Sequence, residues 1–488
     1  MRALIALTLG EPFGEHLAPT RAAHAALELI GSPLTVKGEL IAWEGVAEAR
    51  ALAGITDVEL YAQPGDLVRP HDQSGHKIGL VVAAGATAAD ASAALDAATA
   101  LIRPVIRPTE EDSVNSPRPA VRRNASPYLY GGEAAAVAQV LESGQYGHSD
   151  VTEKFEREVA AYLDVPEVVA VESGTAALHM ALLAAGIGNG DEVVVPSLTF
   201  AASVQAIVAV GARPRFAEID PDTLCVTGAS VLEALTPDTR AVMPVLYGGR
   251  AVDLTDVAPV LAGRGITVVE DAAQAFGSWH GDRKVGAFGA SGTLTCFSFG
   301  PIKNLTCGQG GAVVPRTAQE AETIRLLRML GIRQSQADRI RSTTYSVDTF
   351  GLRYPLSALN AAIGLTQLAR FEEIEAKRPH LWRTYRDALA GIDGVALVDV
   401  DVERSVPFNC VVRVPNRDPV FADLQSRGIG AGVHYPPNHL QAAFAPWHRP
   451  LPVTEQTAEE IMSLPFHPAM TEQDVGAVVD ALRKAVAP

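Results

Sequence analysis

Cysteine is scarce in this sequence. The 488 residues contain only four cysteines, at positions Cys225, Cys296, Cys307 and Cys410. They are scattered without the spacing of a metal site or of a disulfide framework, so we expect neither a bound metal nor disulfide bonds. Unpaired thiols are typical of a reducing compartment, and the sequence therefore predicts a cytoplasmic protein.

Long apolar runs are also missing. The run at the N-terminus extends only from Leu4 to Leu9, whereas a membrane-spanning helix needs about 20 apolar residues. Glu11 follows it without the small-residue cleavage site of a secretion signal. We interpret this run as a first strand and expect no membrane partner.

Positive charge is in short supply as well. The sequence has 40 Lys and Arg against 56 Asp and Glu, which gives a formal net charge of −16. This balance argues against a nucleic-acid partner or an anionic-membrane surface, although it is compatible with a local basic pocket for a phosphorylated substrate. The composition is otherwise that of a globular protein, and its length predicts two or three domains.

A change in composition separates a first domain from the rest. Between about Arg103 and Tyr128, prolines alternate with charged residues and serines, which is typical of a linker, and we place the boundary near residue 115. Upstream, Ala88–Leu101 is Ala-rich with helical apolar spacing. Together with four strand-like segments it predicts a small accessory α+β domain at residues 1–115; the strands are Ala3–Leu7, Leu34–Val36, Glu39–Ala42 and Ile78–Ala83.

From about Glu167, short apolar strands alternate with helical segments. This pattern predicts an α/β domain at residues 116–375, with a mostly parallel sheet, helices on both faces and a binding site at the carboxyl ends of the strands. The predicted strands are Val168–Val171, Glu192–Val195, Arg213–Ala217, Ala241–Val245, Thr267–Glu270 and Thr293–Ser298. A smaller α+β domain is expected at residues 376–488, with Leu381–Leu389 and Thr471–Val486 as helices and Val411–Val414 as a strand.

One lysine follows the last of these strands among small and apolar residues. Lys303 lies in the segment CFSFGPIKNLTCGQGG, where we expect it to be partly shielded from water. Desolvation lowers the pKa of an ammonium group, and a neutral lysine can attack an aldehyde to form a Schiff base. By itself the observation is weak, because a lysine at a strand end is more often a solvated surface residue.

Two adjacent carboxylates follow the preceding strand, in VVEDAAQAFGSWHG. Strand alternation places Glu270 and Asp271 on opposite faces, and we expect Asp271 to face the pocket because an apolar helix is predicted directly after it, at Ala272–Phe276. A buried carboxylate paired with a pyridine nitrogen keeps that nitrogen protonated and makes the ring an electron sink. The alternative is that Asp271 only caps the helix.

Two further segments can hold an anion and an aromatic ring. In VESGTAALHMALLAAG a strand turns through Gly174 and Thr175 into an apolar helix whose free amides can bind a phosphate, with Ser298 supplying another hydroxyl. The same turn is also a common helix cap. In PSLTF, Phe200 either stacks on a cofactor ring or is an ordinary core residue.

Taken together, the motifs SGTAAL, PSLTFAAS, EIDPDTL, EDAAQAFGS, GAFG, CFSF followed by PIKN, and GQGGAVV resemble the DegT/StrS family of nucleotide-sugar and aminocyclitol aminotransferases. The resemblance runs from about Tyr128 to the C-terminus. It implies fold type I, the cofactor pyridoxal 5'-phosphate (PLP), and a homodimer with shared active sites. It also implies that Lys303 carries the Schiff base, that Asp271 partners the pyridine nitrogen and that Gln274 lies near the phenolic oxygen. By the same resemblance Gly174, Thr175 and Ser298 hold the phosphate and Phe200 stacks on the ring.

The resemblance extends to three more positions. His434 and Tyr435, in HYPPNHLQAAF, match a segment that lies close to the substrate in relatives. Arg353, in FGLRYPLSALNAAIG, matches a segment that reaches into the neighbouring subunit, where many members have an asparagine that touches the phosphate. An arginine can bind the same anion more strongly. Leu246 departs from the family, because relatives commonly have a histidine there, so the substrate pocket is expected to differ.

A second resemblance covers part of the first domain. The piece from Pro64 to Ile106 resembles the C-terminal lobe of ATP-grasp ligases of the amino-acid ligase type. The glycine-rich nucleotide loop and the metal carboxylates of a working ATP-grasp enzyme are absent from the sequence. We therefore interpret residues 1–115 as an accessory remnant with a structural or interaction role, the alternative being a contact with substrate.

These observations predict a PLP-dependent aminotransferase. It would move an amino group from glutamate or glutamine to a keto-sugar, nucleotide-linked or free, or to a keto-cyclitol, in secondary-metabolite biosynthesis such as that of an antibiotic. One alternative, suggested by the ligase-like fragment, is a PLP enzyme that performs elimination, replacement or an aldol-type reaction on an amino acid. A non-catalytic regulator would require a DNA-binding module or a lost lysine, and the sequence shows neither.

Overall fold

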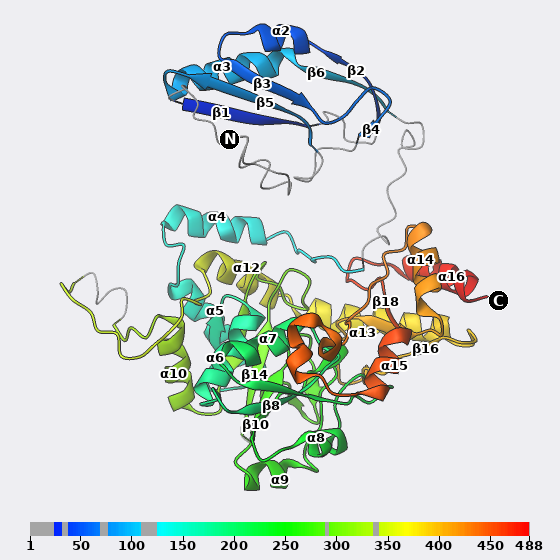
Figure 1. Cartoon of the computed structure of the whole chain (residues 1–488). Helices are drawn as coiled ribbons and strands as arrows, with labels where there is room; N and C mark the ends of the chain where they lie inside the picture. The colour runs from blue at the N-terminus through cyan, green and yellow to red at the C-terminus, as the bar shows by residue number, and fades with distance from the viewer. Residues whose placement is uncertain are drawn as a thin grey trace. The chain divides into compact units, whose positions relative to one another are not determined.

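The computed structural model describes residues 24–31, 38–68, 77–108, 124–287, 292–334 and 341–487. The chain divides into two compact units, Met1–Pro117 and Arg118–Pro488 (Figure 1). The predicted strands Ala3–Leu7 and Leu34–Val36 and the predicted boundary near residue 115 lie outside the described residues. The three predicted domain ranges stay predictions.

The first unit contains two antiparallel three-stranded sheets, with strand orders β1-β5-β3 and β4-β2-β6. Helix α3 packs on β5 and β1, and it coincides with the predicted helix because Thr87 and Asp90 form a capping box at its start. The strands are β1 (His24–Gly31), β2 (Gly38–Glu44), β3 (Ile55–Leu60), β4 (Leu67–Val68), β5 (Lys77–Gly85) and β6 (Arg103–Pro108), and the helices are α2 (Val46–Ala51) and α3 (Ala88–Leu101).

The start of the predicted linker was wrong. Residues Arg103–Pro108 form β6, which pairs with β2 so that Ile106 lies opposite Leu40 and Pro104 opposite Trp43. β6 is an edge strand, where a proline without an N–H group costs no hydrogen bond within the sheet. Proline content therefore indicated an edge strand here as well as a connection.

The second unit is built on a seven-stranded sheet of order β7-β15-β14-β11-β10-β8-β9. Strands β9, β8, β10, β11 and β14 are parallel, whereas β15 runs antiparallel to both β14 and β7. The predicted, mostly parallel α/β architecture is confirmed. The strands are β7 (Val169–Val171), β8 (Glu192–Pro196), β9 (Arg213–Ala217), β10 (Thr239–Val242), β11 (Thr267–Asp271), β14 (Thr293–Ser298) and β15 (Gly311–Val314).

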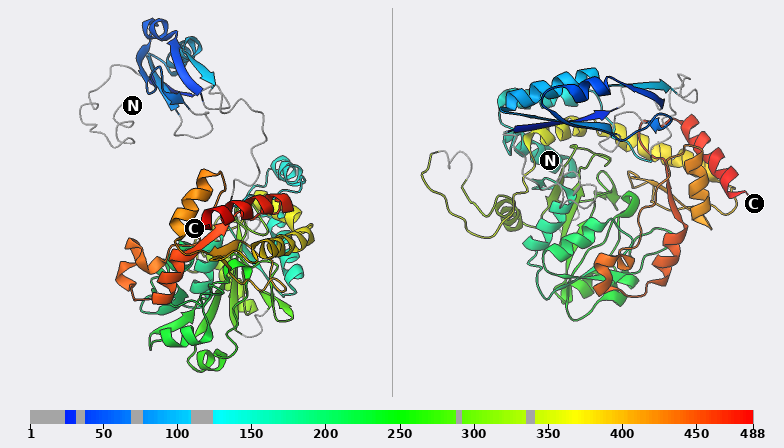
Figure 2. Two further views of the ribbon diagram at one scale, coloured as in Figure 1. Left: turned by 90° about the vertical axis from the view of Figure 1, so that its right-hand side faces the viewer. Right: turned by 45° about the horizontal axis from the view of Figure 1, so that its top comes forward.

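Helices cover both faces of this sheet (Figure 2). Successive residues of β8 alternate between the faces: Val193 belongs to the apolar cluster under α6 (Gly174–Ala184), α7 (Ala201–Ala209) and α10 (Ala318–Arg328). Val194 belongs to the cluster on the opposite face. The α-helices that contribute to that second cluster are α5 (Asp150–Leu163), α8 (Gly228–Ala234), α9 (Ala258–Gly263), α12 (Ala358–Leu368), α13 (Glu372–Leu389) and α15 (Pro452–Glu460).

The C-terminal part of this unit has a core and a sheet of its own. Strands β16 (Ala396–Leu397), β17 (Cys410–Arg413) and β18 (Ile461–Leu464) are antiparallel, and α13 and α16 pack against each other. The predicted helix Leu381–Leu389 lies within α13, and the predicted strand Val411–Val414 is β17 shifted by one residue. The remaining elements are α4 (Glu133–Ser143), η4 (Tyr247–Gly249), β12 (Trp279–His280), β13 (Arg283–Lys284), α14 (Arg417–Ser426), η6 (Asn438–Leu440), η7 (Ala442–Trp447) and α16 (Glu472–Val486).

The helix predicted at Ala272–Phe276 is absent. After β11 the chain makes tight turns instead, because the Ala273 amide donates to Asp271 Oδ1 at 3.1 Å and the Ala275 amide donates to the Ala272 carbonyl at 2.9 Å. Gly277 then adopts a φ of +91°. Asp271 therefore caps no helix, which removes the structural alternative for this residue.

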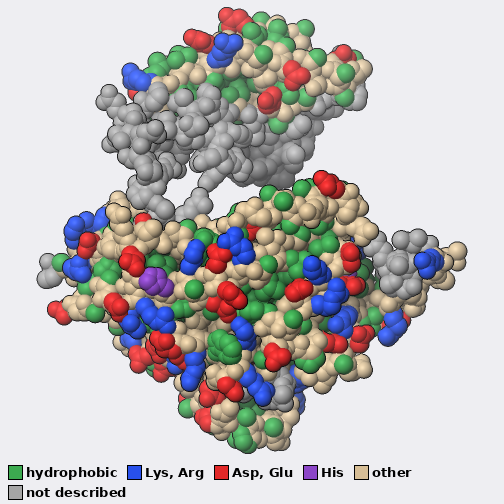
Figure 3. Space-filling view, turned by 180° about the vertical axis from the view of Figure 1, so that it is seen from behind, with side chains coloured by type: hydrophobic (Ala, Val, Ile, Leu, Met, Phe, Trp, Pro, Cys, Tyr) green, Lys and Arg blue, Asp and Glu red, His purple; other side chains and the backbone are tan. Residues whose placement is uncertain are grey.

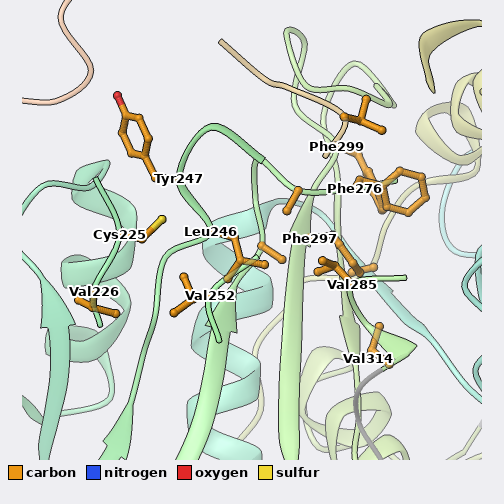
Figure 4. Close-up of a cluster of buried hydrophobic side chains, with 14 of the residues drawn as sticks. Cys225, Val226, Leu246, Tyr247, Val252, Phe276, Val285, Phe297, Phe299 and Val314 are labelled. Carbon is orange, nitrogen blue, oxygen red and sulfur yellow. The ribbon is translucent and has the colours of Figure 1, made fainter. Parts of the chain in front are cut away.

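Aromatic rings pack beneath the loops that follow β11 and β14. Phe276 lies edge-on to Phe297 and to Phe299, with ring centroids 5.2 Å and 5.3 Å apart (Figure 4). All three rings are buried. This packing fixes the carboxyl ends of both strands, where Asp271 and Lys303 are found.

The surface of the second unit carries acidic and basic side chains interspersed (Figure 3). Within the described residues, no helix combines the length and the apolar character needed to cross a bilayer. Nor do those residues gather three or more His, Cys, Asp or Glu side chains into a group suited to a metal ion.

Candidate active site

Lys303 lies in the loop that follows β14. Its Nζ atom is 4.5 Å from the centre of the Phe408 ring. Burial lowers the pKa of Lys303 from its ordinary value to about 8, while the nearby Asp271 carboxylate acts in the opposite direction. Lys303 is thus partly buried rather than fully solvated, and its lowered pKa favours the neutral amine under mildly alkaline conditions.

Asp271 ends β11 and is 6% exposed. Ser203, from α7, donates a hydrogen bond to Asp271 Oδ2 at 2.6 Å. Burial raises the pKa of Asp271, and the bonds from Ser203 and Ala273 oppose that rise. Its neighbour Glu270 points to the other face, where it accepts from Thr295 at 2.8 Å. The two carboxylates therefore point to opposite faces of the sheet, as predicted.

The start of α6 forms a close-fitting cradle. Ser173 caps the helix by accepting from the Ala176 amide at 3.1 Å, and the exposed Thr175 lies in the first turn. A Cβ atom added to Gly174 would lie 2.7 Å from Ser298 Cβ, so only glycine fits. Free amides at the start of a helix, together with the Ser298 hydroxyl, are suited to a phosphate.

Three further predicted site residues, Phe200, Gln274 and Tyr435, lie next to one another. The Phe200 ring is 60% exposed, so it is not a core residue, and its centroid is 5.7 Å from that of Tyr435. Gln274 donates from Nε2 to the Tyr435 hydroxyl at 3.1 Å and accepts from the Gly248 amide at 2.8 Å. Both the nitrogen and the oxygen of the Gln274 side-chain amide therefore make hydrogen bonds, which fix its orientation.

His434 belongs to the same group of residues. Its Nδ1 atom is 2.7 Å from Ser463 Oγ, and its carbonyl accepts a hydrogen bond from the Tyr247 hydroxyl. Burial lowers the pKa of His434, and the positive charge of the nearby Lys303 lowers it further. The single chain therefore brings together Lys303, Asp271 and His434.

Arg353 is a predicted site residue that does not contact the other predicted site residues within a single chain. Its side chain is exposed and makes no hydrogen bond or ion pair to any of the described residues, while its backbone pairs with Met329. Three residues earlier, Phe350 is fully exposed. Both belong to the segment for which a contact with a neighbouring subunit was predicted.

Two neighbours of these residues were not predicted. Ser203 lies in α7, four residues after Thr199, and its hydroxyl reaches Asp271 from a distant part of the sequence, so no local pattern indicated the contact. Phe408, which covers Lys303, comes from the C-terminal part of the chain and carries no sequence motif. Only the packing of that part on the sheet reveals it.

Comparison with known families gives two matches. The model of the DegT/DnrJ/EryC1/StrS aminotransferase family matches residues 128–483. The model of the L-amino acid ligase C-terminal domain 2 matches residues 33–107, which confirms the resemblance of this part to amino-acid ligases.

Solved structures of similar proteins cover the second unit. DesV of S. venezuelae, in complex with a ketimine intermediate, is 37% identical over 73% of this chain and 94% of its own, with a TM-score of 0.68. The aminotransferase TlmJ from Streptoalloteichus hindustanus is 34% identical over 74% and 98%, with a TM-score of 0.69. The sugar aminotransferase CalS13 from Micromonospora echinospora is 32% identical over 74% and 99%, with a TM-score of 0.69.

Proposed function

The chain belongs to the DegT/DnrJ/EryC1/StrS aminotransferase family, and on that premise we propose that it transfers an amino group from glutamate or glutamine to a keto-sugar, nucleotide-linked or free, or to a keto-cyclitol. It is a PLP-dependent aminotransferase of fold type I. The similarity to the sugar aminotransferase CalS13 supports a sugar acceptor, and we propose a role in secondary metabolism such as antibiotic biosynthesis.

The described residues fit PLP on chemical grounds. The phosphate would be held by the amides at the start of α6, including Gly174 and Thr175, and by the Ser298 hydroxyl. Asp271, buried and beside Lys303, would partner the pyridine nitrogen. Phe200 would lie against the ring.

When bound, PLP supplies an aldehyde to which a lysine can attach and a ring that withdraws electrons from the amino carbon. The Lys303 amine would form the attachment, and once freed it would carry the proton between the substrate carbon and the cofactor. A pKa of about 8 suits both tasks, because the amine must be able to lose and regain a proton near neutral pH. Gln274 would donate to the phenolic oxygen, and His434 and Tyr435 would contact the substrate.

The observation that carries this proposal is that Asp271 ends β11 while Lys303 follows the adjacent strand β14, which brings the carboxylate and the amine into electrostatic reach of each other. Replacing Lys303 by alanine is expected to remove the visible absorbance of bound PLP and to lower turnover by roughly 10²- to 10⁴-fold. Survival of both signals would reject the assignment.

A half-reaction tests the reaction type. Incubation with glutamate alone should convert the bound cofactor to pyridoxamine phosphate, and a panel of keto-sugars and keto-cyclitols should then restore PLP and yield an amino product. The ligase-like first unit favours the alternative of elimination, replacement or an aldol-type reaction on an amino acid. Release of a keto acid, a replaced side chain or an aldehyde, with the cofactor remaining PLP, would favour that alternative.

We also propose that the enzyme is a homodimer with shared active sites. The exposed Arg353 side chain and the fully exposed Phe350 support this arrangement, because both lie in the segment expected to reach a second subunit. Arg353 would then contact the phosphate bound by the partner. The four cysteines are free and buried, which supports the proposed location in a reducing cytoplasm.

A further inference from the structure

A run of buried hydroxyl groups leads away from Asp271. Ser203 donates to Asp271 Oδ2 at 2.6 Å, and Thr199 Oγ1 lies 2.8 Å from Ser203 Oγ. The Ser203 hydroxyl has two acceptors within reach, the Phe200 carbonyl at 3.3 Å and Asp271 Oδ2 at 2.6 Å. An ionised carboxylate is the stronger acceptor and is also the nearer one, so the single proton of Ser203 points at Asp271. Thr199 must then donate to Ser203, which fixes the direction of both bonds. Thr199 and Ser203 are 2% and 0% exposed, so water does not compete for these bonds.

The loop that carries Thr199 is held from the far end of the chain. Asn438 Nδ2 donates to the Ser197 carbonyl at 3.0 Å and to the Thr199 carbonyl at 2.7 Å. The Asn438 amide adds a third bond, to the Ser197 carbonyl at 2.9 Å. Asn438 is 2% exposed. Its side chain thus fixes both ends of the three-residue loop that precedes Phe200.

His439 holds the same loop by its side chain. Its Nδ1 atom is 2.6 Å from Ser197 Oγ, and its amide donates to the same oxygen at 3.0 Å. Its Nε2 atom is 3.1 Å from Glu455 Oε1. A carboxylate requires a donor, so Nε2 carries the proton and Nδ1 accepts from the Ser197 hydroxyl. Ser197 is fully buried, which excludes it as a nucleophile toward substrate.

We propose that Asn438 and His439 are positioning residues that clamp loop 197–199, so that Thr199 and Ser203 direct a hydroxyl proton at Asp271. This inference rests on the proposed function in one respect, namely that Asp271 faces the pyridine nitrogen. The clamp explains why a segment about 240 residues away in sequence is needed for the carboxylate to keep its orientation.

Ser203→Ala tests the contact with Asp271. Loss of a hydrogen bond to a charged group is expected to weaken PLP binding about tenfold and to change the visible circular dichroism of bound PLP. Ser203→Thr keeps the hydroxyl and should restore both signals. Ser405→Ala is the matched control, because Ser405 is a buried serine whose hydroxyl donates to the Val400 carbonyl, and it should leave both signals unchanged. Native signals in Ser203→Ala would overturn the inference.

His439→Leu and His439→Asn test the clamp. Leucine removes the acceptor for Ser197, whereas the Asn oxygen can replace Nδ1, so PLP binding should weaken in the first variant and recover in the second. If the clamp acts through Ser203, the double variant of Ser203→Ala and His439→Leu should bind PLP no worse than Ser203→Ala alone. Additive losses would contradict the inference. If His439→Leu does not fold, as thermal unfolding will show, the Ser203 series decides the case.

The two proposals fail in different ways. If Asp271 is not a cofactor residue, the Asp271→Asn variant will bind PLP normally, and the proposed function loses its site. If only the clamp is wrong, Asp271→Asn will weaken PLP binding while the Ser203 and His439 variants leave it unchanged. PLP itself is the probe throughout, added to the full-length apoenzyme.

Discussion

At the scale of the residue, the environment of Lys303 decides whether the site works. A lysine in water is almost entirely protonated at neutral pH, and a protonated amine cannot attack an aldehyde. Burial against the Phe408 ring lowers the pKa of Lys303 to about 8. Attachment of the cofactor thus depends on the packing of the C-terminal part of the chain over the loop after β14.

The first prediction concerns the pH dependence of PLP capture by the apoenzyme. Because only the neutral amine reacts, the rate should rise with pH and level off above about 8. Stopped-flow absorbance measures the rate, and Lys303→Ala provides the blank. A rate that does not change with pH, or one that continues to rise toward the ordinary lysine value of 10.5, would contradict the prediction.

A second prediction compares the two adjacent carboxylates. Asp271→Asn removes the negative charge that would partner the pyridine nitrogen, at a cost of about 1.5–3 kcal/mol in PLP binding, or roughly 10- to 100-fold in Kd. Glu270→Gln should leave Kd unchanged, because Glu270 lies on the other face of β11, where it bonds Thr295. Spectroscopic titration measures both, and equal losses in the two variants would refute the assignment.

Glu270→Gln has a consequence of its own for stability. Burial raises the pKa of Glu270 from 4.5 to about 7, so the folded protein prefers the protonated form. The protonated Glu270 side chain thus stabilises the fold fully below about pH 4.5. This stabilisation is lost as the pH rises through about 7, because the buried side chain then ionises. The glutamine variant lacks this loss and should therefore gain stability relative to the native protein as the pH is raised, as thermal unfolding would measure.

At the scale of the element, strand ends and helix starts were predictable from sequence, whereas turns were not. β9, β14 and α3 have the bounds that were predicted, because short apolar runs and a helical apolar period identify them. The helix at Ala272–Phe276 was wrong, since the Asp271 side chain binds the Ala273 amide and turns the chain. The order of β15 between β7 and β14 could not be read from a local pattern.

The candidate site shows the same division. Asp271 ends β11, Gly174 begins α6 and Lys303 lies in the loop directly after β14, so their positions followed from parallel-sheet topology. Ser203, Phe408 and the contacts of His439 depend on long-range packing, and local spacing carries little information about them. The role of Gln274 came from family resemblance, and its bond to Tyr435 came only with the structure.

A third prediction belongs to the start of α6. Gly174→Ala forces a methyl group to within 2.7 Å of Ser298 Cβ, which should destabilise the fold by about 1–3 kcal/mol and weaken PLP binding. Gly476→Ala is the matched control, because Gly476 lies in α16 with no atom within 4 Å of an added Cβ. It should stabilise the protein by about 0.5–1 kcal/mol. An undisturbed Gly174→Ala variant would show that the cradle is less tightly packed than described.

For the molecule as a whole, the proposed dimer implies that a single chain has an incomplete active site and that a second copy completes it. Arg353→Ala should weaken PLP binding, because an exposed arginine is proposed to reach the partner's phosphate site. Arg483→Ala is a suitable control, since Arg483 pairs with Asp480 on α16. Light scattering gives the oligomeric state, and a PLP-binding monomer unaffected by Arg353→Ala would contradict the shared site.

Trapping the cofactor on its lysine tests the proposed PLP site most directly. Borohydride reduction of the PLP-loaded enzyme, followed by proteolysis and mass spectrometry, locates the pyridoxyl group on one peptide. We expect the group on Lys303, and we expect none on the Lys303→Ala variant. A label on another lysine, or an unlabelled native enzyme, would contradict the claim that the groups at the ends of β7, β11 and β14 form one PLP site.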